Sequence, residues 1–144
     1  SVRFNHTYAL VLADIDHFTR INDTHGHQVG DEVLKHVASL LGGQLRTVDR
    51  LARYGGEEFA IVMVETDRKQ AVEAMERLFA LLAETPCQVN PTLSLSVTLS
   101  AGVAEMPHDA ASPSELVAAA DEALYAAKKA GRNRVFTAKR ARKE

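Results

Sequence analysis

Residues 48–64 read Val48-Asp49-Arg50-Leu51-Ala52-Arg53-Tyr54-Gly55-Gly56-Glu57-Glu58-Phe59-Ala60-Ile61-Val62-Met63-Val64. Two β-prone runs on either side of a Gly-Gly pair predict a β-hairpin, because the positive φ angles of a tight turn need glycine. The two glutamates after the glycines repel each other and add nothing to a hairpin. They form either a solvated turn or a metal and phosphate site, since Gly-Gly lets a ligand approach the backbone closely.

The composition is that of an ordinary soluble globular protein. Of the 144 residues, 46% are hydrophobic and 25% are charged, which suits a single domain over residues 1–144 with a real core. The net charge of −2 gives no global basic surface for nucleic acid, so no nucleic-acid partner is expected. The basic residues within 138–144 are interpreted as a mobile tail.

Cysteine content and hydropathy limit the class further. The single cysteine, Cys87, excludes an intramolecular disulfide and a cysteine metal cluster. No apolar run approaches the ~20 residues of a membrane span, and the chain does not open with a signal peptide. We expect a cytoplasmic domain without a membrane partner in this chain, which leaves open a membrane tether elsewhere in a full-length protein.

Three more strands are predicted from apolar patterns. A continuous apolar run over residues 8–13 is typical of a buried central strand. Strict alternation over 93–100, with small hydroxyl side chains on the polar face, indicates a second strand. A short strand is expected over 134–137.

Three helices are expected between the strands. A polar loop over 24–30 leads into a helix that begins at Asp31, and a second helix begins at Asp67. A third begins at Ser112 or Ser114 and ends at Gly131. This alternation predicts an α+β fold with one mixed, mainly antiparallel sheet and helices on its faces.

Asp14 ends the first strand and Glu57 flanks the hairpin turn, so the two carboxylates converge if their strands are neighbours. Oxygen ligands without cysteine suit Mg²⁺ or Mn²⁺, which nucleotidyl transfer uses to neutralise and align a triphosphate. Because strand side chains alternate, we expect Glu57 to share the metal and Glu58 to be secondary. Asp16 either caps the next turn or supports the site. The pair His25 and His27 is weak support for zinc.

Seven motifs together resemble the GGDEF family, the bacterial diguanylate cyclases. They cover roughly residues 8–137 in family order and spacing: Arg53-Tyr54-Gly55-Gly56-Glu57-Glu58-Phe59, Asp14-Ile15-Asp16-His17-Phe18, Ile21-Asn22-Asp23, Gly26-His27, Gly30-Asp31-Glu32-Val33-Leu34, Ala120-Asp121-Glu122-Ala123-Leu124-Tyr125 and Ala130-Gly131-Arg132-Asn133. The resemblance implies a ferredoxin-like, palm-like nucleotidyl cyclase fold with a central five-stranded sheet. It also implies condensation of two GTP into cyclic di-GMP across a homodimer.

The resemblance further implies roles for single residues. Asp14, the carbonyl of Ile15 and Glu57 would bind metal, and Glu57, supported by Glu58, would act on the attacking 3′-hydroxyl. The substrate-binding residues would cradle phosphates, reach the terminal phosphates and read guanine; they are His17, Phe18, Gly55, Gly56, Lys128, Arg132, Asn22, His27 and Asp31.

Some of these residues have competing explanations. Lys128 and Arg132 also fit as positive charge at a helix C-terminus, which accounts for Lys128 better than for Arg132. Asp31 could equally cap a helix, although a carboxylate is the natural acceptor for the two N–H donors of guanine.

A second site follows from the same resemblance. Arg46-Thr47-Val48-Asp49 is similar to the family's Arg-x-x-Asp site, which binds the product cyclic di-GMP and inhibits the enzyme. Arginine suits this role because it grips phosphate and guanine in a bidentate way. Arg77 matches a further arginine of that site.

The sequence departs from the family in two places. Thr19 stands where the family usually has a lysine thought to stabilise the transition state, so turnover is expected to be slow. The family's leading segment is missing, so the chain is interpreted as a catalytic domain without its regulatory region. The alternative function is a receptor that binds GTP or cyclic di-GMP without useful turnover.

Overall fold

The computed structural model describes residues 6–53 and 56–138. Its main sheet has five strands in the order β2-β3-β1-β6-β7. Neighbouring strands are antiparallel except β6 and β7, which are parallel. The strands are β1 (Tyr8–Ile15), β2 (Arg50–Arg53), β3 (Glu58–Val64), β6 (Leu99–Met106) and β7 (Arg134–Thr137). The predicted α+β class with a mainly antiparallel five-stranded sheet is confirmed.

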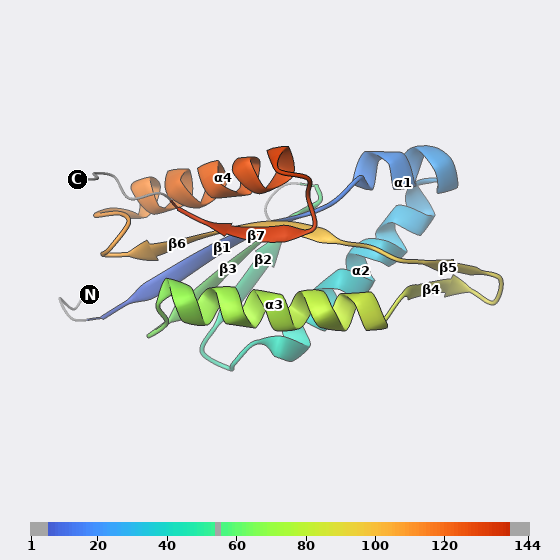
Figure 1. Cartoon of the computed structure of the whole chain (residues 1–144). Coiled ribbons are helices and arrows are strands. Elements are labelled where there is room, and N and C mark those ends of the chain that lie inside the picture. Colours follow the sequence, from blue (N-terminus) through green and yellow to red (C-terminus); the bar gives the residue numbers. More distant parts are fainter. Residues whose placement is uncertain (1–5, 54–55, 139–144) are drawn as a thin grey trace.

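The helices cover both faces of this sheet. They are α1 (Phe18–His25), α2 (His27–Gln44), α3 (Arg68–Glu84) and α4 (Pro113–Lys129). Figure 1 shows α4 on one face and α2 and α3 on the other. Alternate residues of β1 point to opposite faces of the sheet. Val11 belongs to the buried apolar cluster that includes residues of α2 and α3, and Leu12 belongs to the cluster that includes residues of α4.

A glycine in β6 lets α4 approach the sheet closely. A Cβ atom at Gly102 would lie 2.2 Å from the carbonyl oxygen of Ala120 and 2.3 Å from the amide nitrogen of Leu124. Any larger residue would therefore push the helix away from the strand. The close packing fixes the C-terminal turn of α4, which carries Lys128.

Two helix starts agree with the sequence. The side chain of Asp67 accepts the amide hydrogen of Gln70, whose side chain accepts that of Asp67, and this capping box begins α3. Ser112 caps α4 by accepting the amide hydrogen of Glu115.

The predicted loop over 24–30 is wrong. Gly26, at φ 95°, ends α1, and α2 begins at His27 rather than at Asp31. Gly30 lies inside α2, where a Cβ atom would be 1.8 Å from Oδ1 of Asn22. The glycine therefore serves close packing between α1 and α2 and does not mark a loop.

The predicted single strand over 93–100 is also wrong in part. It divides into β5 (Leu93–Leu95) and the start of β6, with residues 96–98 between them. β5 pairs with β4 (Cys87–Asn90) in a separate hairpin, which projects beyond the main sheet in Figure 1. Alternation does not reveal this break, because side chains keep period two when a strand changes partners.

The hairpin of residues 48–64 forms as β2 and β3, which pair from Arg50 with Val62 to Arg53 with Phe59. Tyr54 and Gly55 lie outside the described residues. So does the proposed tail from residue 139 onward, whereas Ala138 is buried and its amide donates to the carbonyl of Val103 at 2.8 Å.

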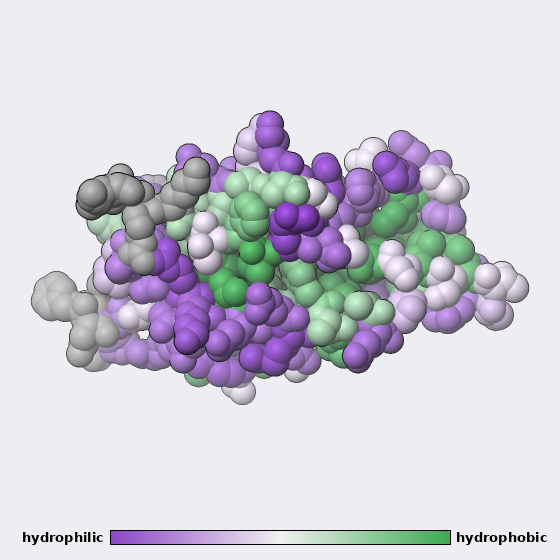
Figure 2. Space-filling model, in the orientation of Figure 1, coloured by the Kyte–Doolittle hydropathy of each residue, from purple (hydrophilic) through white to green (hydrophobic). Residues whose placement is uncertain are grey.

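The surface is hydrophilic over most of the outward face of α3 and becomes more apolar near its C-terminal end (Figure 2). A cleft of about 280 Å³ lies at that end, lined mainly by apolar residues, among them Phe79, Val97 and Leu99. None of the helices within 6–53 and 56–138 is both long and apolar enough to cross a membrane.

Candidate active site at the end of β1

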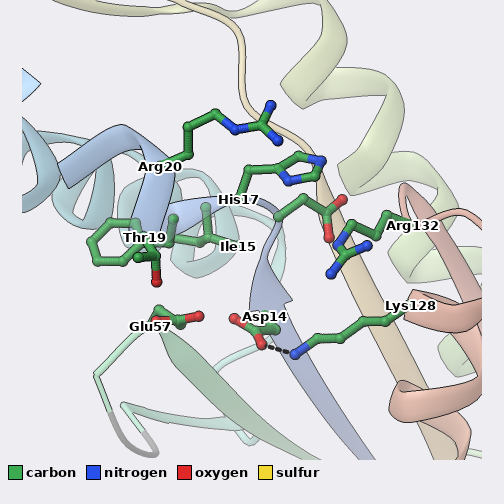
Figure 3. Close-up of a pocket in the computed structure, with 10 residues that line it drawn as sticks. Asp14, Ile15, His17, Thr19, Arg20, Glu57, Lys128 and Arg132 are labelled. Atoms are coloured by element: carbon green, nitrogen blue, oxygen red, sulfur yellow. Dashed lines mark hydrogen bonds and ion pairs between the residues drawn. The ribbon is translucent and has the colours of Figure 1, made fainter. Parts of the chain in front are cut away.

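A cleft of about 260 Å³ opens where β1 ends (Figure 3). Its lining residues come from β1, the first turn of α1, the turn before β3 and the end of α4: Asp14, Ile15, Asp16, His17, Phe18, Thr19, Arg20, Glu57, Lys128 and Arg132. The pairing of β1 with β3, which sets Asp14 opposite Glu58, provides the neighbouring strands on which the sequence argument depended.

Asp14 is only 2% exposed, and its two carboxylate oxygens differ in environment. Oδ2 accepts a hydrogen bond from Nζ of Lys128, whereas Oδ1 has no hydrogen-bond partner within the described part of the chain. A buried carboxylate oxygen without a donor is costly. Figure 3 shows the carboxylate of Glu57 facing that of Asp14, so two negative groups meet beside a single ammonium group.

The two glutamates after the turn both respond to this charge. Burial raises the pKa of Glu57, the negative charge of Asp14 raises it further, and Lys128 offsets part of the effect. Burial and Asp14 also raise the pKa of Glu58, with a smaller contribution from Asp121. Only Glu57 lines the cleft. Because Glu57 precedes β3, strand alternation governs Glu58 and the residues after it, but not Glu57.

The donor set of the cleft suits a divalent cation coordinated partly by groups other than side chains. No group of three or more His, Cys, Asp or Glu residues in metal-binding geometry occurs within 6–53 and 56–138. Two carboxylates and the backbone carbonyl of Ile15 would leave the remaining positions of an octahedral Mg²⁺ to water and phosphate, an arrangement that this ion commonly adopts. The unpartnered Oδ1 of Asp14 fits such an ion.

The turn between β1 and α1 has a strained backbone. His17 adopts φ 59° and ψ 31°, a left-handed conformation that is unusual for a residue other than glycine. The turn ends at Phe18, the first residue of α1, where unpaired amide groups can meet an anion. Thr19 lines the cleft beyond it, and Figure 3 shows the guanidinium of Arg20 directed past His17, away from Asp14 and Glu57.

Asp16 has a specific role in the structure that sequence reasoning missed. It is 4% exposed and its carboxylate accepts hydrogen bonds from Thr98, Ser100 and Asn133. The small hydroxyl side chains on the polar face of residues 93–100 were the one sign of this role in the sequence. The sequence could not show that Asp16 accepts their hydrogen bonds, because Asp16 is far from them along the chain.

The three residues expected to read guanine lie on α1 and α2, outside the lining of the cleft. Oδ1 of Asn22 is buried and has no hydrogen-bond partner in the described residues. Asp31 is exposed and lines an open depression of about 500 Å³ with Gln28 and Glu32. His27 is the exposed first residue of α2.

The turn residues of the hairpin are described in part. Gly56 is exposed, and its carbonyl accepts a hydrogen bond from Nη2 of Arg53 at 2.9 Å. Gly55 lies outside the described residues. Arg132 is an exposed residue after α4 with φ 65°, and it lines the cleft with Lys128.

A second pocket of about 280 Å³ brings Arg46, Asp49 and Arg77 together. Arg46 donates to both carboxylate oxygens of Asp49, at 3.2 and 2.9 Å, and to the carbonyl of Val64 at 2.7 Å. It also donates to Oγ1 of Thr66 at 2.8 Å. Burial raises the pKa of Asp49, but the hydrogen bonds and charge of Arg46 outweigh burial and hold that pKa below its ordinary value.

Comparison with known proteins gives consistent matches. The family model described as "Diguanylate cyclase, GGDEF domain" matches residues 2–134. The probable diguanylate cyclase DgcT of Escherichia coli (strain K12) is 41% identical over 130 residues, which are 89% of this chain and 28% of that protein. The chain spans about a third or less of the length of the curated relatives it matches most strongly.

Solved structures agree with the family match. The GGDEF domain of PA1120 (YfiN or TpbB) from Pseudomonas aeruginosa has a TM-score of 0.91 at 33% identity, covering 94% of this chain and 84% of that one. The GGDEF domain of DgcB from Caulobacter crescentus, solved with c-di-GMP, has a TM-score of 0.82 at 36% identity, covering 92% and 78%. The chain belongs to the GGDEF family of diguanylate cyclase domains.

Proposed function

We propose that this domain is a diguanylate cyclase, which condenses two GTP into cyclic di-GMP and two pyrophosphates. The observation that carries the proposal is the cleft at the end of β1. There, a buried oxygen of Asp14 lacks a hydrogen-bond partner among the described residues, and the carboxylate of Glu57 faces that of Asp14. A divalent cation, which a nucleoside triphosphate brings with it, would supply the partner for these two carboxylates.

The residues of the cleft have two kinds of role in the proposed nucleotidyl transfer, metal binding and phosphate binding. Asp14, Glu57 and the carbonyl of Ile15 would hold Mg²⁺ or Mn²⁺, which would supply positive charge against the triphosphate. Lys128 and Arg132 lie at the mouth of the same cleft and bind the terminal phosphates, which leave as pyrophosphate. The amides after His17 bind phosphate at the start of α1, and Gly55 and Gly56 are proposed to contribute to the same phosphate cradle.

Glu57 is also suited to act on the 3′-hydroxyl. Its carboxylate lines the cleft and faces Asp14, where it can accept the proton of a bound hydroxyl. The 3′-oxygen of one GTP attacks the α-phosphorus of the other, the bond to pyrophosphate breaks, and the 3′-proton passes to Glu57. Glu58 supports this charge arrangement from the start of β3.

Cyclisation requires two such attacks, so two domains must face each other with one GTP in each cleft. We therefore propose a homodimer as the active form. Asn22 and Asp31 read the guanine edge, with His27 beside them. The carboxamide of Asn22 and the carboxylate of Asp31 are suited to this role, since together they offer donors and acceptors that match the guanine edge.

The pocket of Arg46, Asp49 and Arg77 is proposed to bind the product and inhibit the enzyme. Arg46 is held by Asp49, by Thr66 and by the carbonyl of Val64, so its guanidinium is oriented before any ligand arrives. An oriented arginine binds phosphate or guanine at a smaller entropy cost.

A second candidate function is a nucleotide receptor without useful turnover. Thr19 favours it, because a hydroxyl cannot supply the charge of the family's lysine. Arg20, the next cation along the chain, is directed away from Asp14 and Glu57.

The deciding experiment incubates the protein with GTP and Mg²⁺ and follows cyclic di-GMP by chromatography, beside the variant Glu57→Ala. The wild type, fused to a dimerising partner if necessary, is expected to form the product and Glu57→Ala is not. A dimeric wild type that binds GTP but makes no product would establish the receptor function instead.

A further inference from the structure

Asp16 is buried beside the cleft, and both of its carboxylate oxygens are already bound. Oδ1 accepts from Oγ of Ser100 at 2.6 Å, and Oδ2 accepts from Oγ1 of Thr98 at 2.6 Å and from the amide of Asn133 at 3.0 Å. Asp14, two residues earlier, has an oxygen with no donor among the described residues. Of the two aspartates in Asp14-Ile15-Asp16, the first therefore has a carboxylate oxygen that is free of protein hydrogen bonds in the described part of the chain, whereas both oxygens of the second accept at least one.

The donors to Asp16 belong to two segments that are remote in the sequence. Thr98 and Ser100 flank the start of β6, and the amide of Asp16 returns a bond to the carbonyl of Thr98 at 2.9 Å. Asn133 belongs to the turn between α4 and β7. One buried side chain thus joins the β1–α1 turn, the start of β6 and the turn after α4.

The turn after α4 needs such an anchor. Gly131, Arg132 and Asn133 have φ angles of 127°, 65° and 51°, and two of these three residues are not glycine. Left-handed conformations of this kind cost free energy and persist only when the surroundings hold them. The hydrogen bond from Asn133 to Asp16 is one such restraint, and it acts on the residue next to Arg132.

We propose that Asp16 is a positioning residue, which fixes Arg132 against the β1–α1 turn and does not bind the metal. Arg132 lines the cleft from this turn, where its amide also donates to the carbonyl of Ala127 at 3.0 Å, so the bond from Asn133 to Asp16 ties an already folded turn to the β1–α1 turn. The carboxylate thereby sets the distance between Arg132 and the amides after His17, which together would enclose the terminal phosphates. This role rests on the proposed binding of GTP in the cleft.

The geometry distinguishes two substitutions of Asp16. Asparagine is isosteric: with its oxygen in the place of Oδ2, it still accepts from Thr98 and Asn133, and its amide group donates to Ser100. Alanine removes all three bonds. A metal ligand would behave differently, because an asparagine in its place loses the anionic oxygen that a hard cation needs.

The first measurement is Mn²⁺ binding to the full chain without nucleotide, by calorimetry or by electron paramagnetic resonance. Asp16→Asn is expected to keep the wild-type Mn²⁺ affinity within about twofold, whereas Asp14→Asn loses at least ~10-fold through removal of a ligand. A loss for Asp16→Asn as large as that for Asp14→Asn would overturn the proposal.

The second measurement is a double-mutant cycle on GTP affinity with Asp16→Ala, Arg132→Ala and the double variant. Each single variant is expected to weaken GTP binding by ~10-fold, the scale of one charge-assisted hydrogen bond, and the double variant is no weaker than the worse single. Additive losses would show that Asp16 does not act through Arg132.

Thr98→Val supplies the same test if Asp16→Ala does not fold, since it removes one donor and keeps the side-chain shape. It should weaken GTP binding in the wild-type background but have no further effect beside Arg132→Ala. An equal loss in both backgrounds contradicts the proposal. These binding readouts remain valid if the protein makes no cyclic di-GMP, so failure of the enzymatic proposal is distinguishable.

Discussion

The two ends of the β2–β3 hairpin carry two polar pockets with opposite states of charge pairing. Near the start of β3, Asp14 and Glu57 face each other beside Lys128, and one Asp14 oxygen has no hydrogen-bond partner among the described residues. Near its other end, Arg46 is bound by Asp49 and by the carbonyl of Val64, the last residue of β3. The first pocket thus holds a buried carboxylate oxygen that is unpaired, and the second holds an arginine and an aspartate that are paired with each other.

This difference indicates how each pocket treats a ligand. An unpaired buried oxygen favours an incoming cation, so binding there relieves a cost already present in the free protein. The charge of Arg46 is already balanced by Asp49, so a ligand gains less from electrostatic attraction there. Because the guanidinium is held in position, ligand binding depends mainly on the match in shape and hydrogen bonds between ligand and pocket. The first pocket suits a reaction with a metal nucleotide, and the second suits recognition of a formed product.

The largest effect is expected from Asp14→Asn. Removing the anionic oxygen should lower cyclic di-GMP formation by at least ~10²-fold, the scale of a lost transition-state contact. Product binding at Arg46 should stay unchanged, because the substitution lies at the other end of the hairpin. Chromatography of the product and calorimetry with cyclic di-GMP measure the two effects, and a parallel loss of both would show that the pockets are not independent.

Arg46→Ala is expected to break the second pocket. Losing its charge-assisted bonds should weaken cyclic di-GMP binding by ~10–100-fold and relieve product inhibition. Arg50→Ala is the matched control, since Arg50 donates to the carbonyls of Thr47 and Asp49 and is not among the described residues that line the pocket. Equal affinities of Arg46→Ala and the wild type by calorimetry would remove the inhibitory site.

Thr19→Lys tests whether the first pocket lacks positive charge for turnover. A lysine there should raise the rate of cyclic di-GMP formation by up to ~10-fold, part of the range for one transition-state donor. Thr19→Met, long but neutral, controls for side-chain length. If both variants match the wild-type rate, another group already supplies the charge.

The smallest effect concerns pH. Burial and the charge of Asp14 raise the pKa values of Glu57 and Glu58, so both bind protons more tightly in the folded protein than in the unfolded chain. Without metal, this contribution to stability is present at low pH and is lost as pH rises through the folded values. Because Mn²⁺ needs the charged forms, its affinity should fall on acidification before pH reaches ~4.3, the ordinary glutamate value.

Calorimetric titration with Mn²⁺ over a pH series measures this shift, and Glu57→Gln serves as the control with one titrating group removed. The variant should bind Mn²⁺ more weakly and show a shallower pH dependence. A wild-type affinity that stays constant down to the ordinary glutamate range would contradict the raised pKa values.

Sequence reasoning predicted the elements whose local signals agree with their tertiary roles. Asp67 and Ser112 cap their helices, and the apolar run of β1 is buried in the centre of the sheet. The predicted element was wrong where a glycine is needed for close packing between two helices. Gly30 resembles a loop residue along the chain, yet it lies in α2 because Asn22 occupies the space where a Cβ atom would be.

Some residues that were predicted to act together line one cleft, but their hydrogen bonds could not be predicted. The argument from neighbouring strands paired Asp14 with Glu57, the family resemblance added Lys128, and all three line the cleft at the end of β1. The separate environments of Asp14 and Asp16 could not be predicted, because Thr98, Ser100 and Asn133 reach Asp16 only through the fold. Two aspartates in one motif thus differ by their remote neighbours.

The central place of β1 has a consequence for folding. β1 precedes the other strands of the sheet along the chain and lies between β3 and β6, and its residues Tyr8 and Ile15 pair with Met106 and Leu99 of β6. Contacts across such sequence separations close late and slow the folding of a chain. The cleft at the end of β1 is therefore among the last parts of the domain to form during synthesis, so a partly made chain has no site for nucleotide.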